Sequence, residues 1–145
     1  MLANAVKTAK LHFMRLVSFT NGLELLVHND IRLKNTVLNL LYKVGSAQED
    51  KTQTGLAHFL EHIMFEGSAN FPNFDAELQA MMAENNAFTG QDYTCYYEIF
   101  PHRFFKRVLQ IEKDRMYHLA IKTKSVHLQS SVIQEEFKET SLHPP

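Results

Sequence analysis

The sequence of 145 residues contains a single cysteine, Cys95, so no disulfide can form within the chain. One thiol fits a reducing compartment, and we interpret Cys95 as a small apolar strand residue rather than a reactive nucleophile. The sequence also lacks an apolar run of the roughly 20 residues that span a bilayer. The formal net charge is −1, which favours neither nucleic acid nor a membrane surface as a partner.

Acidic residues are absent from the basic N-terminal stretch MLANAVKTAKLHFMRLVSF. A transit peptide can have this composition, but no clear cleavage site or secretory apolar segment is present, and the stretch runs into a strand pattern. We therefore expect a cytoplasmic protein. A periplasmic location stays open if an export signal has been removed, and a mitochondrial location is less favoured. We interpret residues 1–15 as a flexible N-terminal extension.

Size and composition are those of one globular domain, with 45% hydrophobic and 21% charged residues. We expect a single domain over residues 1–145, without internal repeats. Asn21-Gly22 lies between two β-rich runs and predicts a hairpin over residues 15–30 with a type I′ turn. Residues 36–46 are mostly apolar and predict a third, central strand.

The rest of the chain alternates helical and strand patterns. Asp75 is the expected N-cap of the second helix, and Pro101 marks the start of the third. The expected elements are helices at 55–66, 76–85, 102–120 and 125–140 and a β-rich segment at 86–100. The order βββααβαα predicts an α+β domain, with helices packed on one face of a mostly antiparallel sheet.

Two histidines and a glutamate interrupt the apolar segment TGLAHFLEHIMF. On an α-helix His58 and His62 lie about 40° apart, one turn from each other, so both imidazoles can reach one tetrahedral ion. Glu61 lies about 60° to the other side of His58, near the same face. Burying such groups costs free energy unless each finds a partner, such as a shared metal ion. The pattern therefore favours a zinc site.

The chemistry of such a site explains the choice of residues. Zinc with three protein ligands keeps one position open and lowers the pKa of a bound water towards about 7. Glu61 is placed to accept the proton as that water attacks a peptide carbonyl. The alternative is a chance HxxEH, expected in a few per cent of chains of this length. Such a chance pair would lie on a polar helix face, whereas the flanking residues here are apolar.

Two histidines need a third protein ligand, and the segment VIQEEFKE in the last predicted helix offers one. Glu135, Glu136 and Glu139 are all candidates. Periodicity favours Glu136 beside an apolar seam without deciding between them, and Gln129, seven residues earlier, shares its face. The alternative for this run of glutamates is a solvated helix face.

Other charged residues have a structural interpretation. We expect His102 and His118 at the surface or ends of the helix at 102–120. The acidic and basic residues Glu112, Asp114 and Arg115 are expected to form pairs within the helix or to anchor a loop.

The segment GLAHFLEHIMFEGS, with its HxxEH motif, resembles the pitrilysin/insulysin family of zinc metallopeptidases, the inverzincins, which includes mitochondrial processing peptidases. Further segments fall in the expected order, namely TNGLELLVHND, LLYKVGSAQED, NAFTGQDYTCYYEIFP and VIQEEF. The resemblance covers Phe19 to Thr140, and it is to bacterial zinc proteases in particular.

The resemblance implies a zinc endopeptidase that hydrolyses peptides or small unfolded proteins. It implies one zinc ion per chain, bound by His58, His62 and Glu136, and Glu61 as the general base. Family members often carry a glutamate at the position of Gln129 that supports the site. An amide supplies no charge, so we expect weaker zinc binding here. A purely structural zinc site is a weaker alternative, since structural sites are usually closed.

The residues Asn86, Ala87, Phe88 and Thr89 resemble the edge strand to which family members bind the substrate backbone. In this mode, main-chain hydrogen bonds provide affinity with little regard to side chains. The alternative is an ordinary strand end capped by Asn and Thr.

Family members consist of two homologous halves, each of two related domains, that close around a peptide. The resemblance implies that this chain is most of the first N-terminal domain, a fragment of a longer enzyme. We expect a homologous second half or a C-terminal domain as partner, in cis or in trans, and self-association through apolar surface. The alternative is a noncatalytic subunit like the respiratory core proteins, or a truncated domain with an assembly role. The complete HFLEH motif favours the enzyme.

Overall fold

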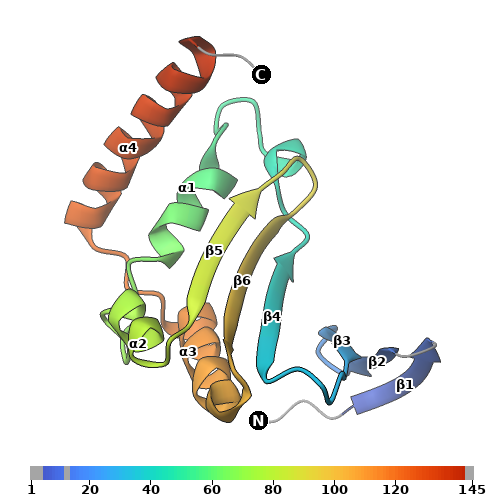
Figure 1. Ribbon diagram of the computed structural model, residues 1–145. Helices are drawn as coiled ribbons and strands as arrows, with labels where there is room; N and C mark the ends of the chain where they lie inside the picture. Colours follow the sequence, from blue (N-terminus) through green and yellow to red (C-terminus); the bar gives the residue numbers. More distant parts are fainter. Residues whose placement is uncertain (1–4, 12–13, 143–145) are drawn as a thin grey trace. The chain divides into compact units, whose positions relative to one another are not determined.

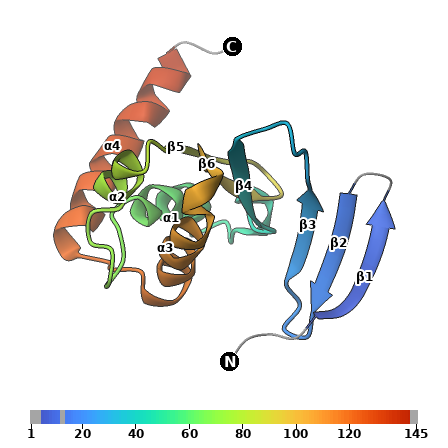
Figure 2. The ribbon, with the colours of Figure 1, turned by 60° about the horizontal axis from the view of Figure 1, so that its bottom comes forward.

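The computed structural model describes residues 5–11 and 14–142, in two compact units, one ending at Lys34 and the other beginning at Asn35. The first unit is an antiparallel sheet in the order β1-β2-β3 (Figures 1 and 2). Its strands are β1 (Ala5–Leu11), β2 (Met14–Phe19) and β3 (Glu24–His28). The single domain expected over residues 1–145 stays a prediction.

Strand β1 lies within residues 1–15, where we expected a flexible extension. Its backbone pairs with β2 from Ala5 opposite Phe19 to Leu11 opposite Met14. The sequence of β1, AVKTAKL, is rich in alanine and lysine, which are depleted in strands. Pairing with β2 therefore gives this segment a structure that its own composition does not indicate.

The expected hairpin is present as β2–β3, but the type I′ turn was wrong. A type I′ turn needs a positive φ at both central residues. Here Gly22 has φ 86°, and Asn21 does not adopt a positive φ. The N–H of Gly22 donates to the carbonyl of Phe19 at 3.1 Å, and Asn21 Oδ1 accepts from the N–H of Leu23 at 3.2 Å. The longer loop confines the left-handed conformation to glycine.

The second unit contains an antiparallel sheet in the order β4-β6-β5 (Figure 1). Its strands are β4 (Asn35–Tyr42), β5 (Glu84–Thr89) and β6 (Thr94–Pro101). Its α-helices are α1 (Leu56–Met64), α2 (Phe74–Ala80), α3 (Phe105–His118) and α4 (Thr123–Leu142). Two short 3₁₀ helices are η1 (Ser46–Gln48) and η2 (His102–Phe104). The central strand of this sheet is β6, so the central place assigned to residues 36–46 was wrong. The segment 86–100 is not one strand but part of the β5–β6 hairpin.

Helix α2 begins and ends earlier than expected. Its N-cap is Asn73, whose Oδ1 accepts from the N–H of Ala76 at 3.1 Å, and Asp75 lies in the first turn. Assigning the cap to Asp75 was wrong because asparagine caps as well as aspartate does. The helix ends at Ala80 with Met81 as its C-cap, and Met82, with φ 55°, follows before β5 begins.

The core lies between one face of this sheet and the helices, where six buried residues form one cluster. They are Phe74, Leu78, Met81, Phe100, Val108 and Ile111. The opposite face exposes Val37, Leu41 and Phe88, because successive strand residues point to opposite faces. The prediction of an α+β fold with antiparallel sheets is confirmed. Within the described ranges, no helix combines the length and apolar character that crossing a membrane requires.

A buried ion cluster joins α3, β6 and the end of α1. The guanidinium of Arg115, 1% exposed, donates to Glu112 Oε2 at 2.7 Å, Glu98 Oε1 at 3.4 Å and the carbonyl of Met64 at 3.2 Å. Two carboxylates thus share one guanidinium. Burial, followed by the neighbouring Glu112, raises the pKa of Glu98 to about 8.

The loop after α1 is anchored by Asp114 on α3. The Asp114 carboxylate accepts hydrogen bonds from Ser68 Oγ at 2.6 Å and from Asn70 Nδ2 at 2.7 Å, and lies 2.7 Å from His118 Nδ1. The hydrogen bond from Ser68 is the main reason that the pKa of Asp114 lies below its usual range. The expected structural roles of Asp114 and Arg115 are confirmed.

Candidate metal centre

The N-cap of helix α1 is Gly55, which has φ 90° and no side chain to cap the helix. Glu49 replaces the missing cap. Its carboxylate oxygens accept from the N–H groups of Gly55 and Ala57, both at 2.7 Å. A negative charge is favourable at a helix N-terminus, where N–H groups lack partners within the helix. These hydrogen bonds, that from Ala57 first, lower the pKa of Glu49.

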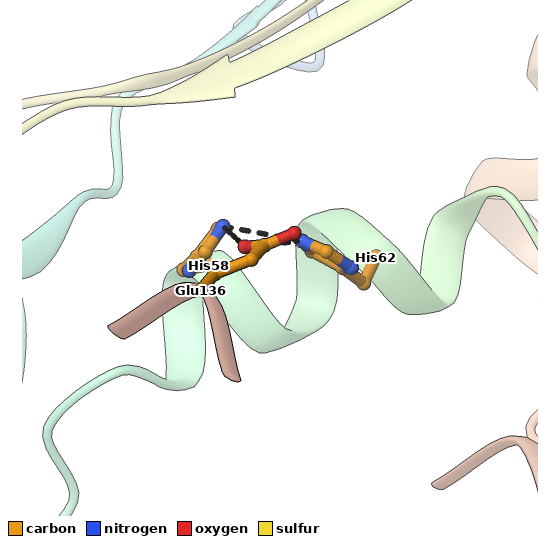
Figure 3. Close-up of side chains that lie close together, drawn as sticks. All are labelled: His58, His62 and Glu136. Atoms are coloured by element: carbon orange, nitrogen blue, oxygen red, sulfur yellow. Dashed lines mark hydrogen bonds and ion pairs between the residues drawn. The ribbon is translucent and has the colours of Figure 1, made fainter. Parts of the chain in front are cut away.

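The histidines of α1 meet a glutamate of α4 (Figure 3). His58 Nε2 and His62 Nε2 lie 3.2 Å apart, and each lies 3.6 Å from Glu136 Oε2. One ligand atom from each residue falls within 4.8 Å of the others. Glu135 instead pairs with Lys138 at 2.7 Å. Of the three candidates Glu135, Glu136 and Glu139, the structure brings Glu136 to the histidines.

This donor set fits a zinc ion. Zinc binds imidazole nitrogen and carboxylate oxygen at about 2.0–2.2 Å, so two ligand atoms of a tetrahedral ion lie about 3.3–3.5 Å apart. The separations of 3.2 and 3.6 Å agree with this spacing to within a few tenths of an ångström. Two imidazoles and one carboxylate also leave a fourth position for water or substrate.

Gln129, predicted to support the site, contacts His62 directly. His62 Nδ1 lies 3.1 Å from Gln129 Oε1, and Gln129 Nε2 donates to Glu66 Oε1 at 2.7 Å. The hydroxyl of Ser125 donates to the other oxygen of Glu66, also at 2.7 Å. Gln129 and Ser125 lie on α4, whereas Glu66 follows the end of α1. Gln129, Glu66 and Ser125 therefore form a hydrogen-bonded group on the Nδ1 side of the His62 ring.

Glu61 is buried, with 8% of its surface exposed. Its Oε2 accepts from the hydroxyl of Thr89 at 2.5 Å. Thr89 Oγ1 lies 3.3 Å from the hydroxyl of Thr94, which in turn donates to the carbonyl of Val44 at 3.0 Å. The carboxylate of Glu61 is therefore held in place from the sheet.

An open cleft of about 710 Å³ lies between the start of α1 and strand β5. It is lined by Ser46, Glu49, Thr54, Gly55, His58, Glu61, Ala87, Phe88, Thr89, Gly90 and Gln91. Of the expected substrate-binding residues, three line the cleft. Asn86 does not, and its side chain accepts from the N–H of Ala87 at 2.8 Å. Strand β5 is an edge of its sheet, which leaves the side away from β6 without a neighbouring strand in the described unit.

Sequence reasoning missed Glu49, Glu66 and Ser125. Glu66 follows His62 by four residues, so counting along the helix would have placed it beside that histidine. Glu49 precedes the start of α1 by several residues, and its capping role depends on the path of the connecting loop. Ser125 reaches the site only through the packing of α4 against α1, which is visible in Figure 1.

Comparison with known proteins gives a consistent result. A family model described as Insulinase (Peptidase family M16) matches residues 26–144. An "Uncharacterized zinc protease" of Rickettsia bellii is 29% identical over 126 residues, which cover 86% of this chain and 31% of that protein. The chain spans about a third of the length of such relatives.

Two solved structures share the fold. A protease from Helicobacter pylori gives a TM-score of 0.76 at 24% identity, with 99% of this chain and 33% of that chain covered. Pitrilysin gives a TM-score of 0.77 at 20% identity, with 95% of this chain and 15% of that chain covered. Both likenesses extend over nearly the whole chain and correspond to a minor part of the larger protein.

Proposed function

Because the chain belongs to the insulinase family of peptidases, family M16, we propose that it is the zinc-dependent endopeptidase domain of a longer enzyme. Its substrates are peptides or small unfolded proteins. The observation that supports this proposal is the meeting of His58, His62 and Glu136, with ligand atoms within 4.8 Å of one another, beside the buried Glu61. Structural zinc sites usually have four protein ligands, whereas catalytic sites have three.

Each residue of the site has a separate role in this proposal. His58, His62 and Glu136 would hold the zinc ion, which when bound supplies Lewis-acid activation of a water molecule and of the peptide carbonyl. Glu61 acts as the general base that accepts a proton from the attacking water and passes it to the leaving amine. Thr89 donates to Glu61 Oε2. We therefore assign the other oxygen, Oε1, as the atom that accepts the proton from the attacking water.

The substrate binds as an added strand on the free edge of β5. Ala87, Phe88 and Thr89 line the cleft that also contains His58 and Glu61. Main-chain pairing along β5 aligns an extended peptide with little dependence on its side chains. This mode suits a peptidase for unfolded segments, since folded proteins rarely present a free extended strand.

The partner is a homologous second half or a C-terminal domain, in cis or in trans. Two observations support this proposal. The chain corresponds to 31% of its Rickettsia bellii relative, and one sheet face exposes Val37 and Leu41 by 57% and 55%. Exposed apolar surface of this kind marks interaction sites and also favours self-association.

The decisive experiment measures zinc per chain by elemental analysis, in protein purified without chelator or histidine tag. We expect about one zinc ion, lost in Glu136→Ala and retained in Glu135→Ala as the matched control on the same helix. Glu61→Gln should retain zinc and abolish peptide hydrolysis, assayed with the partner half present. A folded chain that binds no zinc would contradict the proposal. Zinc binding without hydrolysis in the wild type would favour the noncatalytic assembly role.

A further inference from the structure

Gln129, Glu66 and Ser125, on the Nδ1 side of the His62 ring, are joined in a series of hydrogen bonds. His62 Nδ1 lies 3.1 Å from Gln129 Oε1, and Gln129 Nε2 lies 2.7 Å from Glu66 Oε1. Ser125 Oγ, on a side chain 6% exposed, lies 2.7 Å from Glu66 Oε2. Both oxygens of Glu66 are therefore engaged, each by a donor from α4.

The chemistry of the groups fixes the direction of each bond. An ionised carboxylate only accepts, so Gln129 must turn its amino group towards Glu66 and its carbonyl oxygen towards His62. That oxygen also only accepts, so the proton of a neutral His62 ring must lie on Nδ1. The hydrogen bonds from Gln129 and then Ser125 lower the pKa of Glu66, which agrees with an ionised carboxylate.

The consequence lies at the other ring nitrogen. With Nδ1 protonated, His62 Nε2 carries a lone pair, and this is the atom that lies 3.2 Å from His58 Nε2 and 3.6 Å from Glu136 Oε2. A metal ligand must present a lone pair to the ion, and a partner on the second ring nitrogen fixes both tautomer and ring orientation.

We propose that Glu66 is a positioning residue that sets the metal-binding tautomer of His62 through the amide of Gln129. The proposal rests on the zinc site proposed above. Neither Gln129 nor Glu66 is a ligand; each acts through His62. Because Gln129 has no charge of its own, the negative charge that favours the Nδ1–H form lies one hydrogen bond further away, on Glu66.

This arrangement depends on the Glu66 carboxylate acting only as a hydrogen-bond acceptor. In Glu66→Gln the side chain keeps its size but can either donate or accept a hydrogen bond. The orientation of the Gln129 amide is then no longer fixed, and its oxygen need not face His62. Combining Glu66→Gln with Gln129→Glu places the carboxylate at position 129, where it accepts directly from His62 Nδ1. The double variant should therefore recover what the single variant loses.

The test reads the His62 tautomer in the metal-free 145-residue chain by long-range ¹H–¹⁵N NMR, above the pH at which the rings are protonated. The His62 signals are assigned by their absence in His62→Asn. We expect a proton on Nδ1 in the wild type, mixed tautomers in Glu66→Gln and a return to Nδ1 in the double variant. Zinc affinity, measured by chelator competition, should fall about tenfold in Glu66→Gln and recover in the double variant. Glu135→Gln, an exposed change on the same helix, should match the wild type in both measurements.

Three results would overturn the proposal. The first is a wild-type His62 protonated on Nε2. The second is an unchanged tautomer in Glu66→Gln, with or without a loss of zinc affinity, since such a loss would then reflect general support of α4. The third is a double variant that stays mixed. A chain that binds no zinc or hydrolyses no peptide counts against the proposed function. Because the tautomer is read without metal, the NMR measurement still decides whether Glu66 sets the tautomer of His62.

Discussion

The hydroxyl of Thr89 donates to Glu61 Oε2 at 2.5 Å and so joins strand β5 to helix α1. The residue that we assign to the substrate strand thereby holds the residue that we assign as the base. A shift of β5 would move the Glu61 carboxylate. The position of the substrate backbone and the position of the base are therefore coupled through one side chain.

Replacing Thr89 by valine should test this coupling. Thr89→Val keeps the shape and removes the hydroxyl, which leaves a buried carboxylate without its donor at a cost of about 1–3 kcal/mol in the free energy of unfolding. We expect unchanged zinc content, a lower melting temperature and slower peptide hydrolysis. Thr89→Ser, which keeps the hydroxyl, is the control. Wild-type stability and hydrolysis in Thr89→Val would show that the hydrogen bond is dispensable.

The cap provided by Glu49 leads to a second prediction. Glu49→Ala removes the acceptor for the N–H groups of Gly55 and Ala57, and loss of a helix cap typically costs about 1 kcal/mol. We expect a lower midpoint of urea unfolding and faster hydrogen exchange of the Ala57 amide. Glu139→Ala, an exposed change on α4, should alter neither. Protection of the Ala57 amide that survives Glu49→Ala would assign the capping role to another group.

The cluster of Glu98, Glu112 and Arg115 predicts how stability depends on pH. The pKa of Glu98 is raised from 4.5 to about 8 on folding, so between these values the folded chain holds more protons than the unfolded chain. The free energy of unfolding should therefore fall as the pH rises through this window, by at most about 1.4 kcal/mol per pH unit. Asp114 has a lowered pKa, so its contribution is lost only on acidification below the usual carboxyl range.

Urea unfolding at mildly acidic, neutral and mildly alkaline pH measures this slope. Glu98→Gln keeps the shape and removes the titrating proton, so its stability should vary less with pH than that of the wild type. Glu135→Gln, whose carboxylate is exposed and pairs with Lys138, should keep the wild-type slope. Equal slopes in Glu98→Gln and the wild type would assign the raised pKa to another group.

Local patterns in the sequence predicted what depends on local geometry. The spacing of His58 and His62 fixes their relation because both lie on one helix, and the α1 prediction needed nothing from the rest of the chain. The choice of Glu136 over Glu135 could not be made in the same way. It depends on the rotation of α4 against α1, which packing between elements far apart in sequence determines.

The differences between the expected and the observed elements have a similar origin. Asn73 and Asp75 are both competent caps, so residue type alone could not decide which of them caps α2. The composition of Ala5–Leu11 does not indicate a strand, since its order comes from pairing with β2. Whether a strand is central depends on which partners it finds, so a mostly apolar run alone could not distinguish β4 from β6.

Helix α4 presents Ser125, Gln129 and Glu136 to α1 and to Glu66 just after it, at separations of four and seven residues. These separations are close to one and two whole turns, which is why the three side chains share one face. Inserting or deleting a single residue between Ser125 and Glu136 would rotate Glu136 by about 100° relative to Ser125. Over evolutionary time this segment can therefore exchange its exposed residues freely, while its length must stay constant for as long as the site is used.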